Sequence, residues 1–183
     1  MLVEFGSSII SELKPFGKVF ADPKLHDIPN TVANSVKRFA QAGADLITIH
    51  ASNGAEAIKA GVENRANASI LCVTALTSLS DTDTDYIYNT NSKDTVLKLA
   101  KLAHENGAQG IVCSALELEF LNDFSFLKVT PGIRPSKTND DQKRVATPKD
   151  AIALGSSLLV IGRPITKAEN PLEVIQKINE EVF

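Results

Sequence analysis

The sequence predicts an α/β fold in which a parallel β-sheet is covered by helices. Short apolar runs alternate with amphipathic stretches along the whole chain. The apolar runs are rich in Val, Ile and Leu on both faces, which is typical of buried parallel strands. The stretches between them carry residues that cap and terminate helices. Regular alternation of strand and helix favours a parallel sheet, either as an open doubly wound sheet or as a closed barrel.

Seven segments are expected to be strands, because each is a short apolar run bounded by polar or turn-forming residues. They are residues 2–5, 19–21, 46–50, 70–76, 110–114, 126–130 and 158–161. A closed barrel of this type has eight strands, so the N-terminal strand and helix of such a barrel are expected to be missing here.

Six segments between these runs are expected to be helices. They are residues 31–42, 54–64, 92–106, 115–121, 147–154 and 171–182. Gly43 and Gly107 each follow a helical pattern, where glycine terminates helices. Thr147 and Pro148 suit the cap and the first position of a helix. The acidic run 80–85 lacks the glycine and the final glutamate of a calcium-binding loop, so it is expected to be a solvated loop.

Length and composition indicate a single soluble domain over residues 1–183. The hydrophobic content of 43% and the net charge of −3 are ordinary, and they argue against a nucleic-acid or membrane partner. No apolar run approaches the roughly 20 residues of a membrane-spanning helix, and the first residues do not resemble a signal peptide. Cys72 and Cys113 lie in apolar runs, which indicates buried thiols and a reducing cytoplasm. No cysteine or histidine pattern indicates a metal site.

The segment from Asp22 to Thr31 carries the most chemistry in the chain. Asp22 and Lys24 are two residues apart at the end of an expected strand, so they point to the same side. Asp27 follows in the turn. A cluster of this kind can be a solvated ion pair, which is common and weak. Its position at the carboxyl end of a strand favours a site, because α/β barrels place their chemistry there.

Two loops favour the closed barrel over the open sheet. Each follows one of the last two expected strands, and each combines glycine with an arginine: Arg134 in the first, Gly162 and Arg163 in the second. Barrels build their phosphate site in this way after strands seven and eight. The polar segment 135–145 fits either a lid that closes on a substrate or a solvated linker.

Together these motifs resemble the orotidine 5′-phosphate decarboxylase family, and its bacterial branch most closely. Family enzymes catalyse the last step of UMP synthesis. The motifs occur in family order and cover essentially the whole chain. They are Asp22-Pro-Lys24-Leu-His-Asp27-Ile-Pro-Asn-Thr31, Thr48-Ile-His50-Ala-Ser52, Thr74-Ala-Leu-Thr77-Ser78, Gly110-Ile-Val-Cys-Ser114, Thr130-Pro-Gly-Ile-Arg134, Asp141-Gln142 and Ile161-Gly162-Arg163-Pro.

The resemblance implies a TIM (β/α)8 barrel that works in the cytoplasm as a homodimer, without cofactor or metal. Its substrate is orotidine 5′-phosphate and its product is UMP. Lys24 is expected to donate the proton to C6 of the pyrimidine, and Asp22 to lie beside the substrate carboxylate. Asp27 is expected to reach into the neighbouring subunit's site.

The resemblance also implies contacts to the rest of the nucleotide. Thr31, Thr77 and Ser78 are expected to bind the substrate. The phosphate is expected to contact Gln142, Gly162 and Arg163, with Arg134 and Gln142 on a closing loop. His50 is expected to be a structural histidine.

Three departures from the family pattern affect the expected activity. The family's first strand, which carries an aspartate, is expected to be absent. Aligned on Gly6, Glu4 falls where the family carries a site lysine, and Pro23 replaces an apolar residue that has a backbone N–H. The hypothesis is therefore a poor or inactive decarboxylase. There are two alternatives. One is a nucleotide-binding homologue without activity, and the other is a magnesium-dependent enzyme of the same superfamily that acts on sugar phosphates.

Overall fold

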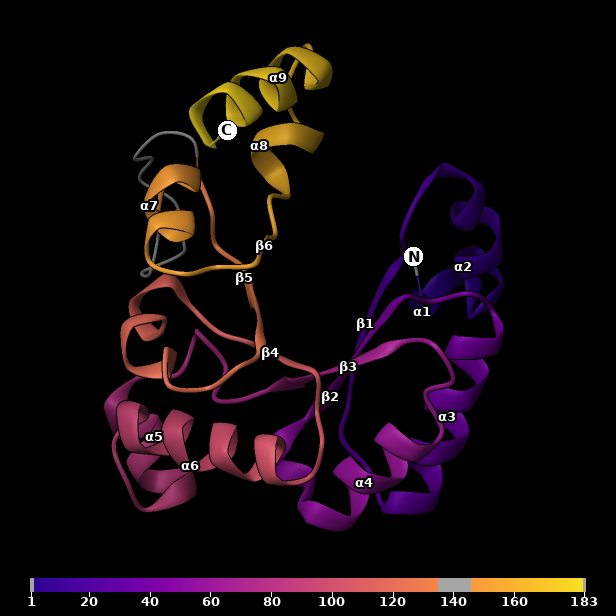
Figure 1. Cartoon of the computed structure of the whole chain (residues 1–183), viewed down its shortest axis with the longest axis vertical. Coiled ribbons are helices and arrows are strands. Elements are labelled where there is room, and N and C mark those ends of the chain that lie inside the picture. The colour runs from indigo at the N-terminus through magenta and orange to yellow at the C-terminus, as the bar shows by residue number, and fades with distance from the viewer. Residues whose placement is uncertain (1, 135–145, 183) are drawn as a thin grey trace. The chain divides into compact units, whose positions relative to one another are not determined.

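The computed structural model describes residues 2–134 and 146–182 (Figure 1). The chain divides into two compact units, the first containing residues up to 74 and 95–111, the second containing residues 75–94 and 112 onward. The boundary between the units falls within α6 (Ser92–Glu105) and within β4 (Gly110–Val112). Whether the two units act as one domain over residues 1–183 stays a prediction.

The first unit contains a parallel sheet with helices that follow its strands. Its elements before α6 and β4 are α1 (Leu2–Phe5), α2 (Ser8–Leu13), η1 (Lys14–Phe16), β1 (Phe20–Leu25), α3 (Pro29–Gln41), β2 (Leu46–His50), η2 (Ala51–Asn53), α4 (Ala55–Glu63) and β3 (Ser69–Val73). Strands β1, β2, β3 and β4 are neighbours in that order, and β2 pairs in parallel with both β1 and β3.

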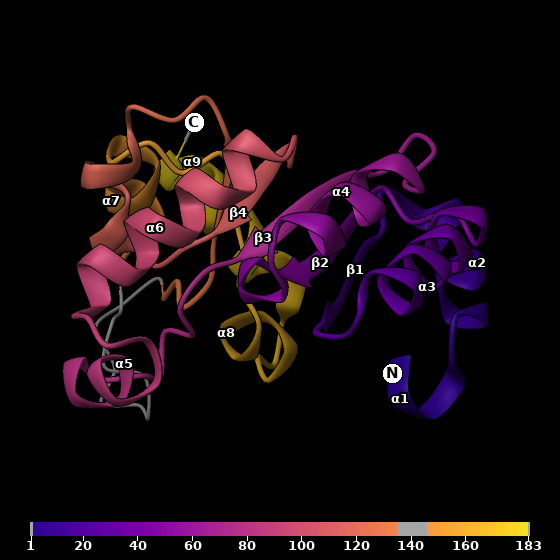
Figure 2. The same cartoon turned by 90° about the horizontal axis from the view of Figure 1, so that it is seen from below.

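Helices α3 and α4 pack side by side in both views (Figures 1 and 2). The side chains of Val32 and Val36 on α3 and of Ile49 on β2 are fully buried. Gly61 on α4 faces the same core, since a Cβ atom there would lie in ordinary van der Waals contact with Ile49 Cδ1 at 3.4 Å and Val32 Cγ1 at 3.5 Å. The apolar faces predicted from the sequence therefore form the core behind β1 and β2.

The second unit contains the end of β4 and two further parallel strands. Its other elements are α5 (Asp81–Tyr88), η3 (Ala115–Glu117), η4 (Glu119–Leu121), β5 (Leu127–Thr130), α7 (Pro148–Ala153), β6 (Leu158–Leu159), α8 (Arg163–Thr166) and α9 (Pro171–Val182). Strand β5 pairs in parallel with β6, and the amide of Cys113 donates to Val129 O at 3.1 Å. Thr147 caps α7 by accepting the amide of Asp150 at 3.1 Å, as the sequence predicted.

Most predicted elements are present, and two match residue for residue: the strand over Leu46–His50 and the helix over Pro171–Val182. The strand expected over residues 2–5 is wrong, because Leu2–Phe5 forms helix α1. Gly6 terminates this helix at φ +62° and donates its amide to Leu2 O at 2.9 Å. Glu4 is thus an exposed helical residue, and its alignment with a lysine on a strand is also wrong.

The acidic run 80–85 is not a loop. It contains the first turn of α5, which begins with a capping box. Ser80 Oγ accepts the amide of Asp83 at 3.2 Å, while Asp83 Oδ2 accepts the amide of Ser80 at 2.8 Å. This reciprocal pair satisfies amides that a helix start leaves free, which explains why an acidic run is helical here.

Residues 115–121 form two short 3-10 turns, η3 and η4, in place of the expected helix. Within the described residues, no helix is both long and apolar enough to span a bilayer.

Candidate active site

A bulge at the end of β1 positions Asp22 and Lys24. Ala21 pairs with Ile47 and Leu25 pairs with Ile49, so residues 22–24 of β1 lie opposite Thr48 alone. Lys24 has a φ of +48°, in the left-handed region that residues other than glycine seldom adopt. Bulges of this kind redirect side chains beside active sites. Pro23 lies inside the bulge, where a residue without an N–H is tolerated.

Three short hydrogen bonds hold Asp22 and Lys24 in the bulge, two through their side chains and one through the backbone of Lys24. Lys24 Nζ lies 2.6 Å from Asp22 Oδ2. Thr48 Oγ1 donates to Asp22 Oδ1 at 2.8 Å and accepts the backbone N–H of Lys24 at 2.9 Å. The Lys24 and Asp22 side chains are 41% and 40% exposed, so a ligand can reach them. The spacing of Asp22 and Lys24 correctly predicted that they meet, but the bulge and the threonine bring them together.

The turn after β1 is held by Asn53 from η2. Its Oδ1 accepts the amide of Asp27 at 3.1 Å, and its Nδ2 donates to Leu25 O at 2.9 Å. Asp27 Oδ1 accepts the amide of Ile28 at 2.7 Å. Asp27 and Thr31 are both exposed, Thr31 in the first turn of α3. The structure therefore gives Asp27 a fixed, accessible carboxylate after the strand.

Two histidines, His26 and His50, lie near the Asp22–Lys24 pair. The rings of His26 and His50 have centroids 5.1 Å apart, and His26 Nε2 lies 3.3 Å from Ser52 Oγ. Burial lowers the pKa of His50, with further lowering from His26 and Lys24, although Asp22 opposes the effect. His50 is consequently neutral at pH 7 and adds no positive charge beside Lys24.

The remaining predicted site residues belong to the second unit. Thr77 and Ser78 are exposed in a turn closed by the amide of Leu79, which donates to Leu76 O at 3.0 Å. Gly162 caps α8, and Arg163, its first residue, is exposed. Gln142 lies outside the described residues.

Arg134 differs from the other predicted ligands that the structure describes, because it is only 6% exposed. Its Nη1 donates to Ile133 O at 3.0 Å, and its amide donates to Ala146 O at 3.0 Å.

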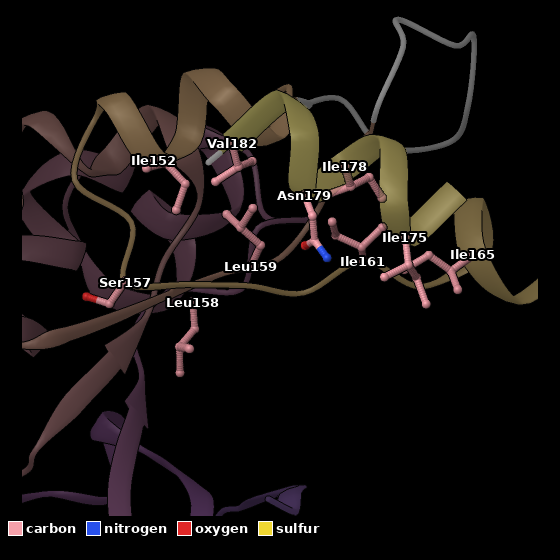
Figure 3. Close-up of a pocket in the computed structure, with 10 residues that line it drawn as sticks. All are labelled: Ile152, Ser157, Leu158, Leu159, Ile161, Ile165, Ile175, Ile178, Asn179 and Val182. Atoms are coloured by element: carbon pink, nitrogen blue, oxygen red, sulfur yellow. The ribbon is translucent and has the colours of Figure 1, made fainter. Parts of the chain in front are cut away.

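A pocket of about 330 Å³ lies beside β6, α8 and α9 in the second unit (Figure 3). Ten residues line it, and all except Ser157 and Asn179 are aliphatic. Figure 3 shows aliphatic side chains from α8 and α9, among them Ile165, Ile175 and Ile178, around it. Because no charged side chain lines it, this pocket is not suited to a phosphate. Within the described ranges, no group of three or more His, Cys, Asp or Glu side chains is arranged to hold a metal ion.

Sequence reasoning did not assign a role to Thr48 or Asn53. Thr48 entered only as part of the motif Thr48-Ile-His50-Ala-Ser52. A signal was available, because a threonine in the middle of the apolar strand Leu46–His50 must find a hydrogen-bond partner when it is buried. The bulge that supplies this partner has no comparable signal in the sequence.

The chain belongs to the orotidine 5′-phosphate decarboxylase / HUMPS family, whose model matches residues 1–178. It is 44% identical to the orotidine 5′-phosphate decarboxylase of Staphylococcus aureus (strain bovine RF122 / ET3-1) over 186 aligned positions. That alignment covers 96% of this chain and 81% of the relative.

Solved structures agree with this assignment. The crystal structure of orotidine 5′-phosphate decarboxylase from Lactobacillus acidophilus matches with a TM-score of 0.84 and 38% identity, covering 97% of this chain and 81% of that one. The corresponding structure from Pyrococcus horikoshii OT3 matches with a TM-score of 0.79 and 24% identity, covering 99% and 82%. These matches confirm the predicted fold class, a TIM (β/α)8 barrel fold of which this chain carries a part.

Proposed function

We propose that this chain catalyses the decarboxylation of orotidine 5′-phosphate to UMP, as the names of its relatives state for those proteins. One observation carries the proposal. A lysine ammonium is held 2.6 Å from an aspartate in a bulge at the carboxyl end of a parallel strand, and both side chains are accessible. Active sites of barrel enzymes lie at this end of the strands.

Lys24 supplies the chemistry that this reaction needs. When the bond between C6 and the carboxylate breaks, CO2 leaves and the electron pair stays on C6. An ammonium about 4 Å away stabilises such a charge by about 4 kcal/mol at an effective dielectric constant of 20, which is roughly a thousandfold in rate. Lys24 Nζ then gives its proton to C6 to form UMP, and it regains a proton from solvent.

Asp22 supports this step in two ways. Its Oδ2 atom fixes the ammonium of Lys24, and its negative charge lies where the substrate carboxylate approaches. The repulsion between two carboxylates favours the loss of one as neutral CO2. No cofactor takes part in this mechanism, because the proton donor is a side chain of the protein.

The proposed contacts to the rest of the nucleotide are those that the family resemblance implies. Arg163 and the backbone of Gly162 bind the phosphate together with Gln142, while Thr77 and Ser78 bind the nucleotide; Arg163 is exposed and carries a full positive charge. Charge-assisted hydrogen bonds to phosphate supply binding energy far from the reacting carbon. Arg134, which is 6% exposed in this structure, belongs to the same proposed binding set with Gln142.

We also propose that the chain acts as a homodimer in the cytoplasm. Asp27 has an exposed carboxylate that accepts the amide of Ile28, and Asn53 fixes its backbone by accepting the amide of Asp27. This carboxylate is suited to reach a neighbouring subunit's substrate. Sedimentation at tens of micromolar, with and without UMP, tests this proposal. A monomer under both conditions would contradict it.

Turnover of orotidine 5′-phosphate in the presence of EDTA discriminates among the functions that the sequence allows. The proposal predicts CO2 release and UMP formation that are insensitive to EDTA and to added Mg²⁺. Activity toward sugar phosphates that requires Mg²⁺ would instead support the related sugar-phosphate enzymes. Binding of UMP without turnover would support the non-catalytic homologue. Glu4 gives no reason to expect poor activity, because it lies in helix α1 and does not take the place of a site lysine on a strand.

A further inference from the structure

We infer that Thr48 is a positioning residue for the decarboxylation, because it holds both Lys24 and Asp22 in the geometry that proton transfer requires. This inference rests on the proposed function. Thr48 is completely buried in the middle of β2, and its hydroxyl is shared between the two residues. It accepts from the backbone of Lys24 and donates to the side chain of Asp22.

The backbone of Lys24 explains why an acceptor is needed at this place. In a regular parallel strand the amide of Lys24 would donate to a carbonyl of the neighbouring strand. The bulge removes that partner, since residues 22–24 lie opposite Thr48 alone. Lys24 also adopts a left-handed φ of +48°, which is unfavourable for a side chain with a Cβ atom. The hydroxyl of Thr48 replaces the lost carbonyl and so maintains the bulge.

The carboxylate of Asp22 depends on the same hydroxyl. Its Oδ1 accepts from Thr48 and its Oδ2 accepts from the ammonium of Lys24, so the plane of the carboxylate is set from both sides. Without the first bond, Asp22 can rotate about its side-chain torsions and the ammonium moves with it. A displacement of about 1 Å in a reacting group can reduce the rate about 100-fold.

Three variants separate positioning from a purely structural role. Thr48→Val keeps the shape and removes the hydroxyl, whereas Thr48→Ser keeps the hydroxyl. Thr84→Val is the matched control, because Thr84 is also fully buried and its hydroxyl bonds to Ser80 O and Asp81 O in a helix of the second unit. All three are compared with the unmodified chain in kcat, KM and the midpoint of urea unfolding.

Positioning predicts that Thr48→Val lowers kcat by about 10- to 100-fold while KM changes by less than about threefold. Thr48→Ser is expected to retain kcat within about threefold, and Thr84→Val to retain both constants although its unfolding midpoint falls. A kcat for Thr48→Val equal to that of the unmodified chain would overturn the inference. So would an equal loss of kcat in Thr84→Val, which would indicate a general effect of stability.

Hydrogen exchange of the Lys24 backbone amide gives a second readout that does not require activity. The inference predicts that exchange of this amide accelerates at least about 10-fold in Thr48→Val, but not in Thr48→Ser or Thr84→Val. Unchanged exchange in Thr48→Val would overturn it. If the unmodified chain turns over no orotidine 5′-phosphate, the proposed function fails, and the exchange of Lys24 alone decides whether Thr48 holds the bulge.

Discussion

Asp45 lies where β1 and β2 begin, and its replacement by asparagine tests how the sheet of the first unit is held. Lys14 Nζ donates to both Asp45 carboxylate oxygens at 2.7 Å, and the amide of Val19 donates to Oδ2 at 2.7 Å. The backbone of Asp45 also accepts the amide of Ser69 at 2.8 Å, so this residue connects the starts of three strands. Loss of its charge should therefore weaken the sheet that carries Lys24.

The expected loss in the free energy of unfolding follows from the hydrogen bonds that Asp45→Asn changes. Asp45→Asn keeps an acceptor for the amide of Val19, but the bond becomes neutral. The loss for that bond is about 1 kcal/mol, the difference between charged and neutral hydrogen bonds. The ion pair with Lys14 adds about 0–1 kcal/mol, because the two side chains are 44% and 27% exposed. The free energy of unfolding is expected to fall by about 1–2 kcal/mol at pH 7.

The stability that the Asp45 carboxylate contributes is expected to decrease at low pH. The hydrogen bond from Lys14 and that from the amide of Val19 hold the pKa of Asp45 below its usual value in the folded chain. A lowered folded pKa means that the carboxylate stabilises the fold above the unfolded pKa of about 4. This stabilisation disappears as the pH falls through the lowered folded pKa. The difference between the unmodified chain and Asp45→Asn should therefore shrink below about pH 4.

Urea unfolding followed by circular dichroism measures this difference. Glu105→Gln is a matched control, because it removes one negative charge from an exposed pair in which Lys101 Nζ lies 3.8 Å from Glu105 Oε1. It is expected to change the free energy by less than about 0.5 kcal/mol. An Asp45→Asn variant as stable as the unmodified chain at pH 7 would refute the reasoning, as would a difference that grows at low pH.

Two further predictions concern the thiols and the phosphate. Burial raises the pKa of both Cys72 and Cys113 to about 12. Neither thiol should therefore react with Ellman's reagent at pH 8 in the native chain, whereas both should react in urea. Rapid reaction of either native thiol would contradict this prediction. Arg163→Ala should weaken UMP binding about 10- to 100-fold in a calorimetric titration, whereas Lys167→Ala, at the C-cap of the same short helix, should not. Equal affinity of the unmodified chain for uridine and UMP would contradict a phosphate site.

The sequence predicted the fold most accurately where a buried apolar pattern decides the structure. The strand Leu46–His50 is buried through Ile47, Thr48 and Ile49, and helix Pro171–Val182 has a regular amphipathic period. The run Leu2–Phe5 is equally apolar, but it buries no residue, and local bonds closed by Gly6 made it helical. Periodicity alone does not distinguish a strand from a helix in so short a run.

Within the candidate site, the sequence predicted that Asp22 and Lys24 meet, but it did not predict the backbone geometry that brings them together. The spacing of Asp22 and Lys24 indicated a pair, and the structure contains one. The bulge that forms the pair depends on register between β1 and β2, which is a tertiary property with no local pattern in the sequence. The role of the Thr48 hydroxyl likewise depends on its two partners in the structure, the backbone N–H of Lys24 and the carboxylate of Asp22. The capping box of Ser80 and Asp83 departs from the usual sequence signature, because its third helical position carries Asp where the motif has Glu or Gln.

Turnover of orotidine 5′-phosphate by Lys24→Ala tests the central claim, that the ammonium of Lys24 beside Asp22 donates the proton to C6. Lys59→Ala is the control, because Lys59 is exposed and forms a surface pair with Glu56 at 3.3 Å. The predicted result is a loss of kcat of at least about 100-fold in Lys24→Ala, with UMP affinity retained within about tenfold. Lys59→Ala should match the unmodified chain. Turnover by Lys24→Ala near the rate of the unmodified chain would contradict the claim.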